Sequence, residues 1–493
     1  MTKIFTVARG EFCRYFISPL AYVYLISFLL LNASFALYFG GIFTSGNASL
    51  RPMFDFLPWL YLLFIPGISM RLWAEEFKSG TILQIMTMPL STATFVWGKF
   101  LAAWAFCSLA LILTFPFVIT LNWLGSPDNA VILNSYFGAF LLSGAMLAVS
   151  QTASALTKNQ VIALVIAVIL NLLFFLSGLE YVLGFFRGFV PEYIIDMIAS
   201  FSFLTRISEI NSGIISLSSI IFFASLIIMF NFFTVMIISL KTSGIVFWLK
   251  LASALGCLLA SLLVFCSFLS INLLSNNLLR SVRLDVTAEK LFTLSDSTKK
   301  ILKNLPAPVT AKVYYSPILG ERDEQMRHHF DTLRQLLKTY ENASNGSFTY
   351  RFYNPEPLSD IEDRAIHAGL LALPVEDLNS SAYFGIVLVN ENGQTRTIPF
   401  LPLSRQNLLE QDLTENIYLL EYQKKPLGLL TSLPMLGEAY DTKVTPPWQI
   451  ITELQKYYTI KPITSPDDLK GLPLLMIAHP QNLSAEMEQA LYD

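Results

Sequence analysis

The polar residues with the clearest potential for chemistry lie in one stretch, 71–100, between two apolar runs. Its charged residues come first: Arg71, Glu75, Glu76 and Lys78. A short apolar helix is expected to follow from about Ser79 to Met88, and Pro89 ends it because the residue before a proline is disfavoured in the α region. Charges beside a short helix suit a lever at the membrane surface that another protein contacts. The alternative is an ordinary connecting loop.

Other residue types that carry chemistry form no recognisable site. The four cysteines have no metal-ligand spacing and are expected to be packing residues: Cys13, Cys107, Cys257 and Cys266. The pair His328-His329 on a charged helix is more typical of a solvated face than of a metal site. No Ser-His-Asp arrangement follows from spacing. We therefore expect no enzyme activity, no metal and no cofactor.

A phosphate-binding loop for ATP is also absent from the sequence. The pattern G-x-x-x-x-G-K-[ST] does not occur, since Gly98-Lys99 is followed by Phe100 and preceded by Ala93 where the first glycine belongs. If ATP drives a process in which this chain takes part, the energy has to come from another subunit.

Composition separates the chain into a membrane part and a soluble part. Of the 493 residues, 54% are hydrophobic and 14% charged, and the mean hydropathy is +0.53, which is too apolar for a soluble protein. Charged residues are sparse before Asn276 and frequent after it. The net charge of −3 and the lack of a basic run give no reason to expect nucleic acid as a partner.

The membrane part is expected to begin with an amphipathic helix and to continue with seven spans. In the helix, over 1–16, one face carries Phe5, Ala8, Phe12 and Tyr15, with Lys3 and Arg14 elsewhere. A span needs about 20 mostly apolar residues. By that rule the spans lie near 18–41, 54–70, 100–122, 132–156, 159–183, 214–240 and 251–274.

Loop charges predict the orientation of the spans. Most Lys and Arg residues of the short loops fall on one side, which is therefore the cytoplasmic side; the other side holds only Arg51, Arg187 and Arg206. Seven spans place the N-terminus inside and the C-terminal half outside. The outer segment 184–213 is apolar enough to form short re-entrant helices. Glu180, near the outer end of span five, is a candidate functional carboxylate, although simple headgroup exposure explains it equally well.

The soluble part alternates β-rich and helical runs. Strands are expected at 310–316, 347–353, 383–390 and 395–400, and helices at 321–343, 358–370 and 404–423. This order predicts a thioredoxin-like unit, but the soluble half has no cysteine and so no redox function. A second α/β unit, the start of a doubly wound sheet, begins at Pro426. We expect it to be truncated, because too few residues remain before Asp493.

The segment RLWAEEFKSGTILQIMTMPLS, from Arg71 to Ser91, resembles the cytoplasmic loop of ABC-2 type transporter permeases. The matching residues are Glu75, Glu76, Gly80, Thr81 and Pro89, with Gly98-Lys99 behind them. The amphipathic start, the SALTKNQ turn over 154–160 and six spans to about Leu240 also fit. The resemblance implies that Arg71 and Leu83 belong to the same ATPase-coupling element.

The span after residue 246 and the soluble half resemble the Gld-type auxiliary component of gliding-motility-associated ABC transporters. The residues that carry this are LDVTAEKLFTLS, from Leu284 to Ser295, with weaker support from YFGIVL, DLTEN and PLGLLT. The expected domains are therefore an ABC-2 permease over 1–245, a linking transmembrane helix over 246–276, an external α/β unit over 277–424 and the second unit over 425–493.

Together the resemblances imply the permease subunit of an exporter in a bacterial inner membrane. It pairs with a separate cytoplasmic ATPase, assembles as a dimer and carries its C-terminal domain in the periplasm. The two amphipathic elements, 1–16 and 79–88, transmit nucleotide-driven closure to the spans. The substrate is not legible in the sequence. The alternative is a non-transporting membrane scaffold whose external domain binds envelope proteins or glycans.

Overall fold

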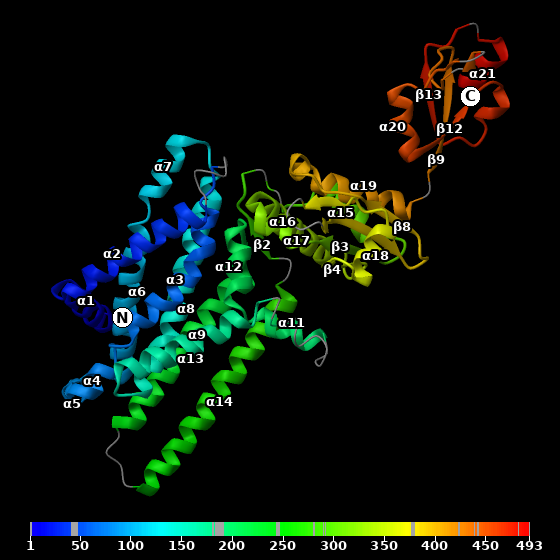
Figure 1. The fold of residues 1–493 in the computed structure, drawn as a ribbon. Coiled ribbons are helices and arrows are strands. Elements are labelled where there is room, and N and C mark those ends of the chain that lie inside the picture. Colours follow the sequence, from blue (N-terminus) through cyan, green and yellow to red (C-terminus); the bar gives the residue numbers. More distant parts are fainter. Residues whose placement is uncertain are drawn as a thin grey trace. The chain divides into compact units, whose positions relative to one another are not determined.

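The chain forms two compact units in a computed structural model, Met1–Thr293 and Leu294–Asp493, and each is described by itself (Figure 1). The structure describes all residues except 1, 41–47, 180–181, 183–191, 243–246, 280–281, 289, 291, 376–379, 423, 438, 441–442, 482 and 493. Glu180 therefore lies outside the described residues.

The first unit consists almost entirely of helices. They are α1 (Thr2–Ile17), α2 (Pro19–Ser34), the π-helix Phe35–Phe39, α3 (Arg51–Ser69), α4 (Ala74–Ser79), α5 (Thr81–Thr87), α6 (Thr92–Ile112), α7 (Pro116–Leu124), α8 (Asn129–Leu156), α9 (Gln160–Leu176), α11 (Glu192–Ser200), α12 (Phe203–Asn211), α13 (Leu217–Thr242) and α14 (Phe247–Leu278). Two short strands, β1 (Ile214–Ser216) and β2 (Arg283–Asp285), pair antiparallel. The unit thus continues past the expected boundary at residue 276.

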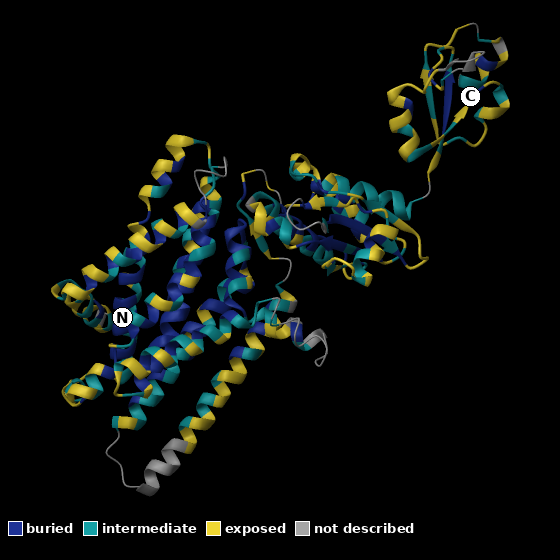
Figure 2. Ribbon diagram, viewed as in Figure 1, coloured by how far each residue is buried: buried dark blue, intermediate teal, exposed yellow. Residues whose placement is uncertain are grey.

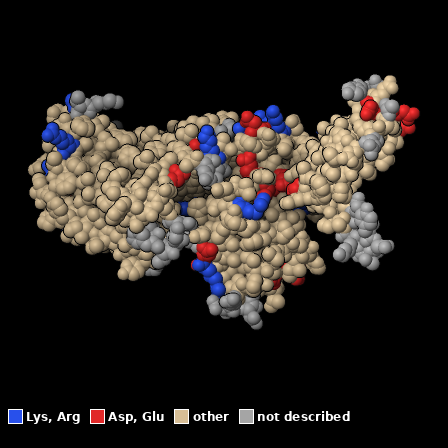
Figure 3. Space-filling view, turned by 90° about the horizontal axis from the view of Figure 1, so that it is seen from above, with Lys and Arg blue, Asp and Glu red and all other residues tan. Residues whose placement is uncertain are grey.

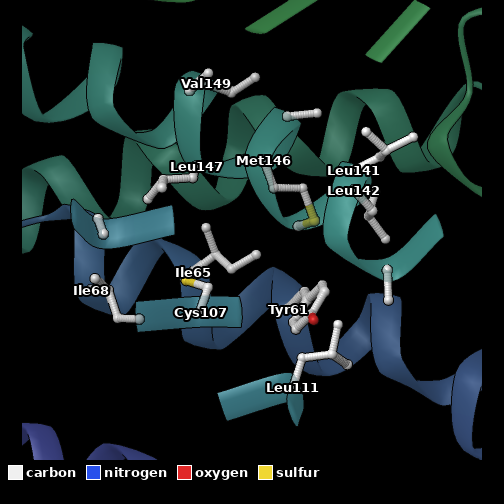
Figure 4. Packing of buried hydrophobic residues seen from close by; sticks show 14 of the residues in the cluster. Tyr61, Ile65, Ile68, Cys107, Leu111, Leu141, Leu142, Met146, Leu147 and Val149 are labelled. Carbon is white, nitrogen blue, oxygen red and sulfur yellow. The ribbon is translucent and has the colours of Figure 1, made fainter. Parts of the chain in front are cut away.

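Three of these helices build the centre of the unit. Side chains of α3, α6 and α8 meet in one buried cluster, shown by Tyr61 and Ile65 of α3, Cys107 of α6 and Met146 of α8 (Figure 4). Along α8 nearly every residue from Gly138 to Ala155 is buried, whereas much of α14 is exposed (Figure 2). Because α8 is covered on all sides, its apolar sequence shows no amphipathic face.

Six helical segments among the described residues are long and apolar enough to cross a membrane. They are Pro19–Tyr38, Arg51–Ser79, Thr92–Leu124, Asn129–Leu156, Leu217–Thr242 and Leu255–Asn276. Each of them overlaps one of the predicted spans, and the multi-pass character of the chain is confirmed. The structure thus agrees with a helical membrane part followed by a part with mixed sheets.

The remaining predicted span, 159–183, corresponds to α9. This helix ends at Leu176, so that it has 17 residues, at the lower limit for crossing the hydrocarbon core. Its exposed face is apolar and repeats every fourth residue, at Val161, Val165, Ile169 and Leu173. Whether the number of membrane crossings is odd or even depends on this one helix. Seven crossings place the two ends of the chain on opposite sides of the membrane, and six crossings place them on the same side.

The predicted re-entrant segment is only partly described. Of 184–213, residues 184–191 lie outside the described part, and most of the rest forms α11 and α12. Arg206, expected in a loop, is buried, with 6% of its surface exposed. Its guanidinium donates hydrogen bonds to Asn276 Oδ1 at 2.7 Å and to Ser218 Oγ at 3.2 Å. This arginine therefore connects α12 to the start of α13 and to the end of α14.

The second unit is built on mixed sheets. Its first elements are α15 (Asp296–Lys303), β3 (Val309–Tyr315), α16 (Ile318–Arg322), α17 (Glu324–Ala343), β4 (Phe348–Tyr353), α18 (Asp360–His367), β5 (Leu373–Val375), β6 (Ser380–Ala382), β7 (Phe384–Asn390), β8 (Thr395–Ile398), the 3-10 helix Leu403–Leu408 and α19 (Leu409–Glu421). The four-stranded sheet has the order β4-β3-β7-β8, with only β3 and β4 parallel. All the strands and helices expected over 310–423 are present.

The last part contains a three-stranded parallel sheet of order β12-β9-β13. Its elements are β9 (Lys425–Thr431), β10 (Ala439–Tyr440), β11 (Lys443–Val444), α20 (Gln449–Tyr457), β12 (Tyr458–Pro462), the 3-10 helix Pro466–Leu469, β13 (Leu474–Ala478) and α21 (Ala485–Tyr492). Leu429 and Leu430, on opposite faces of the central strand, enter two different apolar clusters, as expected for a sheet covered on both faces.

Candidate functional site

The stretch singled out by the sequence forms two short helices and not one. The predicted helix over 79–88 is interrupted at Gly80, which has φ +76° and ends α4 while it begins α5. A left-handed residue stops a helix, and glycine adopts this conformation at the lowest cost. The helix α5 ends at Thr87, and Met88 is extended with ψ 147°, as Pro89 requires. Together α4 and α5 lie at the end of the helical bundle away from α7 (Figure 1).

A buried ion cluster connects this element to two other helices. Lys99 of α6 donates a hydrogen bond to Glu76 Oε1 at 2.8 Å, and its Nζ lies 3.5 Å from Oε1 of Glu11 in α1. The Lys99 side chain is 5% exposed. The hydroxyl of Thr81 donates to the other oxygen of Glu76. One lysine therefore ties together α1, α4 and α6, and Glu76 spans the break at Gly80.

The backbone at the start of α4 is anchored by α8. The amide groups of Trp73 and Ala74 donate to Ser154 Oγ at 3.1 and 3.2 Å, and Ser154 donates to the Met70 carbonyl at 3.0 Å. Amides at a helix start lack partners within their own helix, so a buried hydroxyl from another helix satisfies them. The first residue of the SALTKNQ turn thus fixes the position of α4.

A second anchor comes from α13. Lys241 donates to the carbonyl groups of Ala155 and Leu156, both at 2.8 Å, at the C-terminal end of α8. Cations stabilise helix C-termini, where carbonyl groups lack partners. The Lys241 ammonium also lies 4.8 Å from the centre of the Phe77 ring in α4. Movement of α4 is therefore mechanically linked to the ends of α8 and α13.

The expected coupling residues fall into three places in the structure. Glu76 and Thr81 belong to the ion cluster, and Gly80 is the break between the helices. Arg71, between α3 and α4, and Glu75, in the first turn of α4, have exposed side chains. Leu83 and Pro89 are exposed on α5 and just after it, Leu83 to 67%. One part of the stretch therefore connects helices within the unit, and the other part is exposed to solvent, lipid or a partner.

The helix α5 has one docked face and one open face. Ile82 is buried at 7%, and Ile85 and Met86 pack against the apolar cluster of the first unit. Leu83 and Met88, at 67% and 50%, are exposed, beside the polar residues Gln84 and Thr87. The apolar side that the sequence predicted for α5 is thus divided, and Leu83 does not share the buried side with Ile82.

The helix α1 packs along α6 through a close backbone approach. A side chain at Gly98 would place its Cβ 2.5 Å from Val7 Cγ1, which only glycine avoids. Ala8 is buried, and Tyr15 stacks on Phe106 with ring centres 4.9 Å apart. Phe5, however, is 73% exposed, so the predicted apolar face of α1 is buried only in part.

The histidine and cysteine side chains, which could bind a metal or react, do not all lie where the sequence suggested. His328 contacts Thr332, but His329 is fully buried beside Phe384, and the expected solvated face is wrong for this histidine. Its position on the buried side of α17 could have been read from the helical spacing with Leu333, Leu336 and Leu337. Within the described residues no group of three potential metal ligands occurs. All four cysteines are free; Cys107 is buried, but Cys13 and Cys266 are exposed.

Charged side chains gather in no broad surface patch on the face shown in Figure 3. Acidic and basic groups lie there in small mixed clusters within a much larger uncharged surface. That face offers no extended surface of one sign for a polyanion.

Comparison with known proteins adds one match. Residues 288–389 match a domain of unknown function, DUF7088. No curated protein matches the chain. The matched range begins within the LDVTAEKLFTLS segment and ends in β7, so it covers β3, β4 and most of β7 in the four-stranded sheet.

The buried His329 leads to a pH prediction for the second unit. Burial lowers the pKa of His329 below its ordinary value, and the backbone of Leu401 opposes this to a smaller degree. In the unfolded chain the pKa is about 6.5. Below that pH the unfolded state binds a proton that the folded state does not, so stability falls as the pH falls.

We expect the second unit of the intact protein to become more sensitive to protease and denaturant between pH 7.5 and 5.5. The variant His329→Leu should show a weaker pH dependence, whatever its absolute stability. His367→Gln, which changes an exposed histidine, is the matched control and should keep the wild-type slope. If His329→Leu keeps the wild-type dependence of stability on pH, then His329 does not cause that dependence.

Proposed function

We propose that the chain is the membrane permease subunit of an ABC transporter that couples to a separate ATPase through α4 and α5. The observation that carries the proposal is the open face of α5. Leu83 of this seven-residue helix and Met88 directly after it remain exposed, while the opposite face of the helix is docked on the bundle. So short a helix is unstable alone in water, so it depends on its docking against the bundle. We infer that its exposed apolar side chains form a contact surface for another protein.

The anchors of α4 supply a route for coupling. A partner that pushes on Leu83 moves α5 against Gly80, and Glu76 and Lys99 convey that movement to α6 and α1. Ser154 and Lys241 do the same for α8 and α13. We propose that the ATPase drives the spans in this way, in an inner-membrane dimer that functions as an exporter. Glu180 stays a candidate carboxylate of the membrane part within this proposal.

The second unit is proposed to be the external auxiliary domain of the transporter. Its first sheet combines one parallel pair with two antiparallel pairs in the order β4-β3-β7-β8, which supports a thioredoxin-like unit without redox chemistry. The parallel sheet β12-β9-β13 supports a doubly wound arrangement of this part. Gld-type auxiliary proteins are the family that the sequence resembles here.

The test of the proposal is isolation of the tagged full-length chain from its native membrane in mild detergent. A transporter subunit retains a protein whose peptides contain a P-loop, G-x-x-x-x-G-K-[ST], in fixed ratio to the chain. A membrane scaffold retains envelope proteins or glycans and no such ATPase. The second result overturns the proposal in favour of the alternative.

Topology gives an independent prediction. With α9 as a seventh crossing, Ser79 is cytoplasmic and Gly346 is external. In a background without the four native cysteines, Ser79→Cys should resist an impermeant thiol reagent in cells whose inner membrane is intact, whereas Gly346→Cys should react. Ser79 is the exposed last residue of α4 and Gly346 lies in an exposed turn, so the side chain is accessible in each case. Equal protection of the two cysteines means six crossings and contradicts the orientation.

A further inference from the structure

A cavity of about 410 Å³ lies between α1, α2, the α3–α4 junction and α6. Its inner wall is aromatic. Tyr15 stacks on Phe106 at 4.9 Å between ring centres, and Tyr24 lies 5.6 Å from the same ring. Its rim is charged, with Arg14, Arg71 and Glu75 among the lining residues. An aromatic interior below a charged rim matches a ligand that has an apolar part and a polar head.

Two of the rim charges are available to a ligand. Glu11, Glu76 and Lys99 also line the cavity, but Lys99 pairs with both carboxylates and Arg14 pairs with Glu11 at 3.2 Å, so these two anions and two cations balance. Neither Arg71 nor Glu75 has a side-chain hydrogen bond or ion pair within the described part of the chain, and both are exposed. One cation and one anion at the same rim complement a zwitterion, since a guanidinium binds phosphate and a carboxylate binds an ammonium group.

The cavity opens beside the exposed apolar side of a candidate membrane span. Leu20, in the cavity wall, is 47% exposed, and it begins the exposed apolar side of α2 that continues through Val23 and Ile26. Of this candidate span only 28% of the residues are buried in the protein. A headgroup bound at Arg71 and Glu75 can therefore leave its acyl chains along α2. A small soluble zwitterion gains nothing from that apolar side.

We propose that this cavity binds the headgroup of a phospholipid that carries both a phosphate and a primary ammonium group. Arg71 donates to the phosphate. Glu75 accepts hydrogen bonds from the ammonium, which a quaternary amine cannot donate. The site is separate from the exposed face of α5, and the inference does not rest on the proposed coupling to an ATPase.

The test uses the purified full-length chain without any partner. Native mass spectrometry measures lipid retained after exchange into micelles with equal amounts of phosphatidylethanolamine, phosphatidylcholine and phosphatidylglycerol. We expect about tenfold preference for phosphatidylethanolamine, from one charged hydrogen-bonding pair. Glu75→Gln should remove the preference over phosphatidylcholine, and Arg71→Gln should lower retention of both zwitterionic lipids. Lys78→Gln, an exposed residue of α4 outside the cavity lining, is the control and should match wild type.

Three results overturn the proposal. The first is equal retention of the three lipids. The second is a preference for phosphatidylglycerol, which indicates an anionic-lipid site. The third is equally tight binding of glycerophosphoethanolamine, which has the headgroup without acyl chains and indicates a soluble ligand. Thermal unfolding of each variant shows whether it is folded, and a folded Glu75→Gln chain with undiminished preference also excludes the assigned role of Glu75.

Discussion

Replacement of Leu83 by Asp is expected to abolish co-purification of the ATPase while the chain remains folded and inserted. Leu83 is 67% exposed on α5 and contributes nothing to the buried face, so the chain by itself tolerates the charge. In a complex, however, the aspartate has no cation and loses its water. The cost is roughly 3 kcal/mol, or about a hundredfold in affinity.

Two further variants separate the contact from other effects of a charge. Gln84→Asp adds the same charge to an exposed polar position one residue further on, where it removes no apolar surface, and should keep the partner. Ile82→Asp puts the charge on the docked face, where the side chain is 7% exposed, and should lower the amount of folded protein. Chain level in membranes and ATPase recovery are the two measurements. Undiminished recovery with Leu83→Asp leaves α5 as an ordinary connecting loop.

The sequence was sufficient to locate most helices and strands because their signals are local. Apolar runs of the required length marked the six spans, and Pro89 marked the end of α5. The sequence was not sufficient to tell which apolar residues of α5 are buried and which are exposed. Ile82 and Leu83 are equally apolar, and only the position of the neighbouring helices decides that one is buried and the other exposed. Periodicity reports which residues share a face, but not what covers it.

The ion cluster was missed for a related reason. Glu11, Glu76 and Lys99 are far apart in the chain, and they meet because Gly98 lets α1 approach α6 closely. One signal was available: Lys99 is followed at once by the apolar run of α6, and ionisable residues at such positions are usually paired. The sequence pattern assigned Lys99 to the pair Gly98-Lys99 behind the motif from Glu75 to Pro89, without a charged partner. His329 differs, because its helical spacing with Leu333 and Leu336 was a local signal for the buried side of α17.

Replacement of Lys99 by Met is expected to give the largest loss of stability among variants of the first unit. It removes the cation from two carboxylates, and the Glu76 side chain is only 17% exposed. Removal of one partner from a buried pair costs about 3–5 kcal/mol, because the remaining charge is left without compensation. Thermal unfolding of the purified chain in detergent measures the change, and Lys78→Met, the same change at an exposed site on α4, should have almost no effect.

Neutralisation of the remaining carboxylate distinguishes lost charge pairing from lost packing. If the loss in Lys99→Met arises from an unpaired Glu76, adding Glu76→Gln should recover part of the stability, since the amide can still accept the hydrogen bond from Thr81. In the wild-type background Glu76→Gln should instead destabilise, because Lys99 loses its nearest anion at 2.8 Å. The opposite signs of one substitution in two backgrounds define a coupling energy. If Glu76→Gln destabilises the wild-type and the Lys99→Met chain equally, Lys99 acts only as a packing side chain. The buried ion pair then does not hold α1, α4 and α6 together.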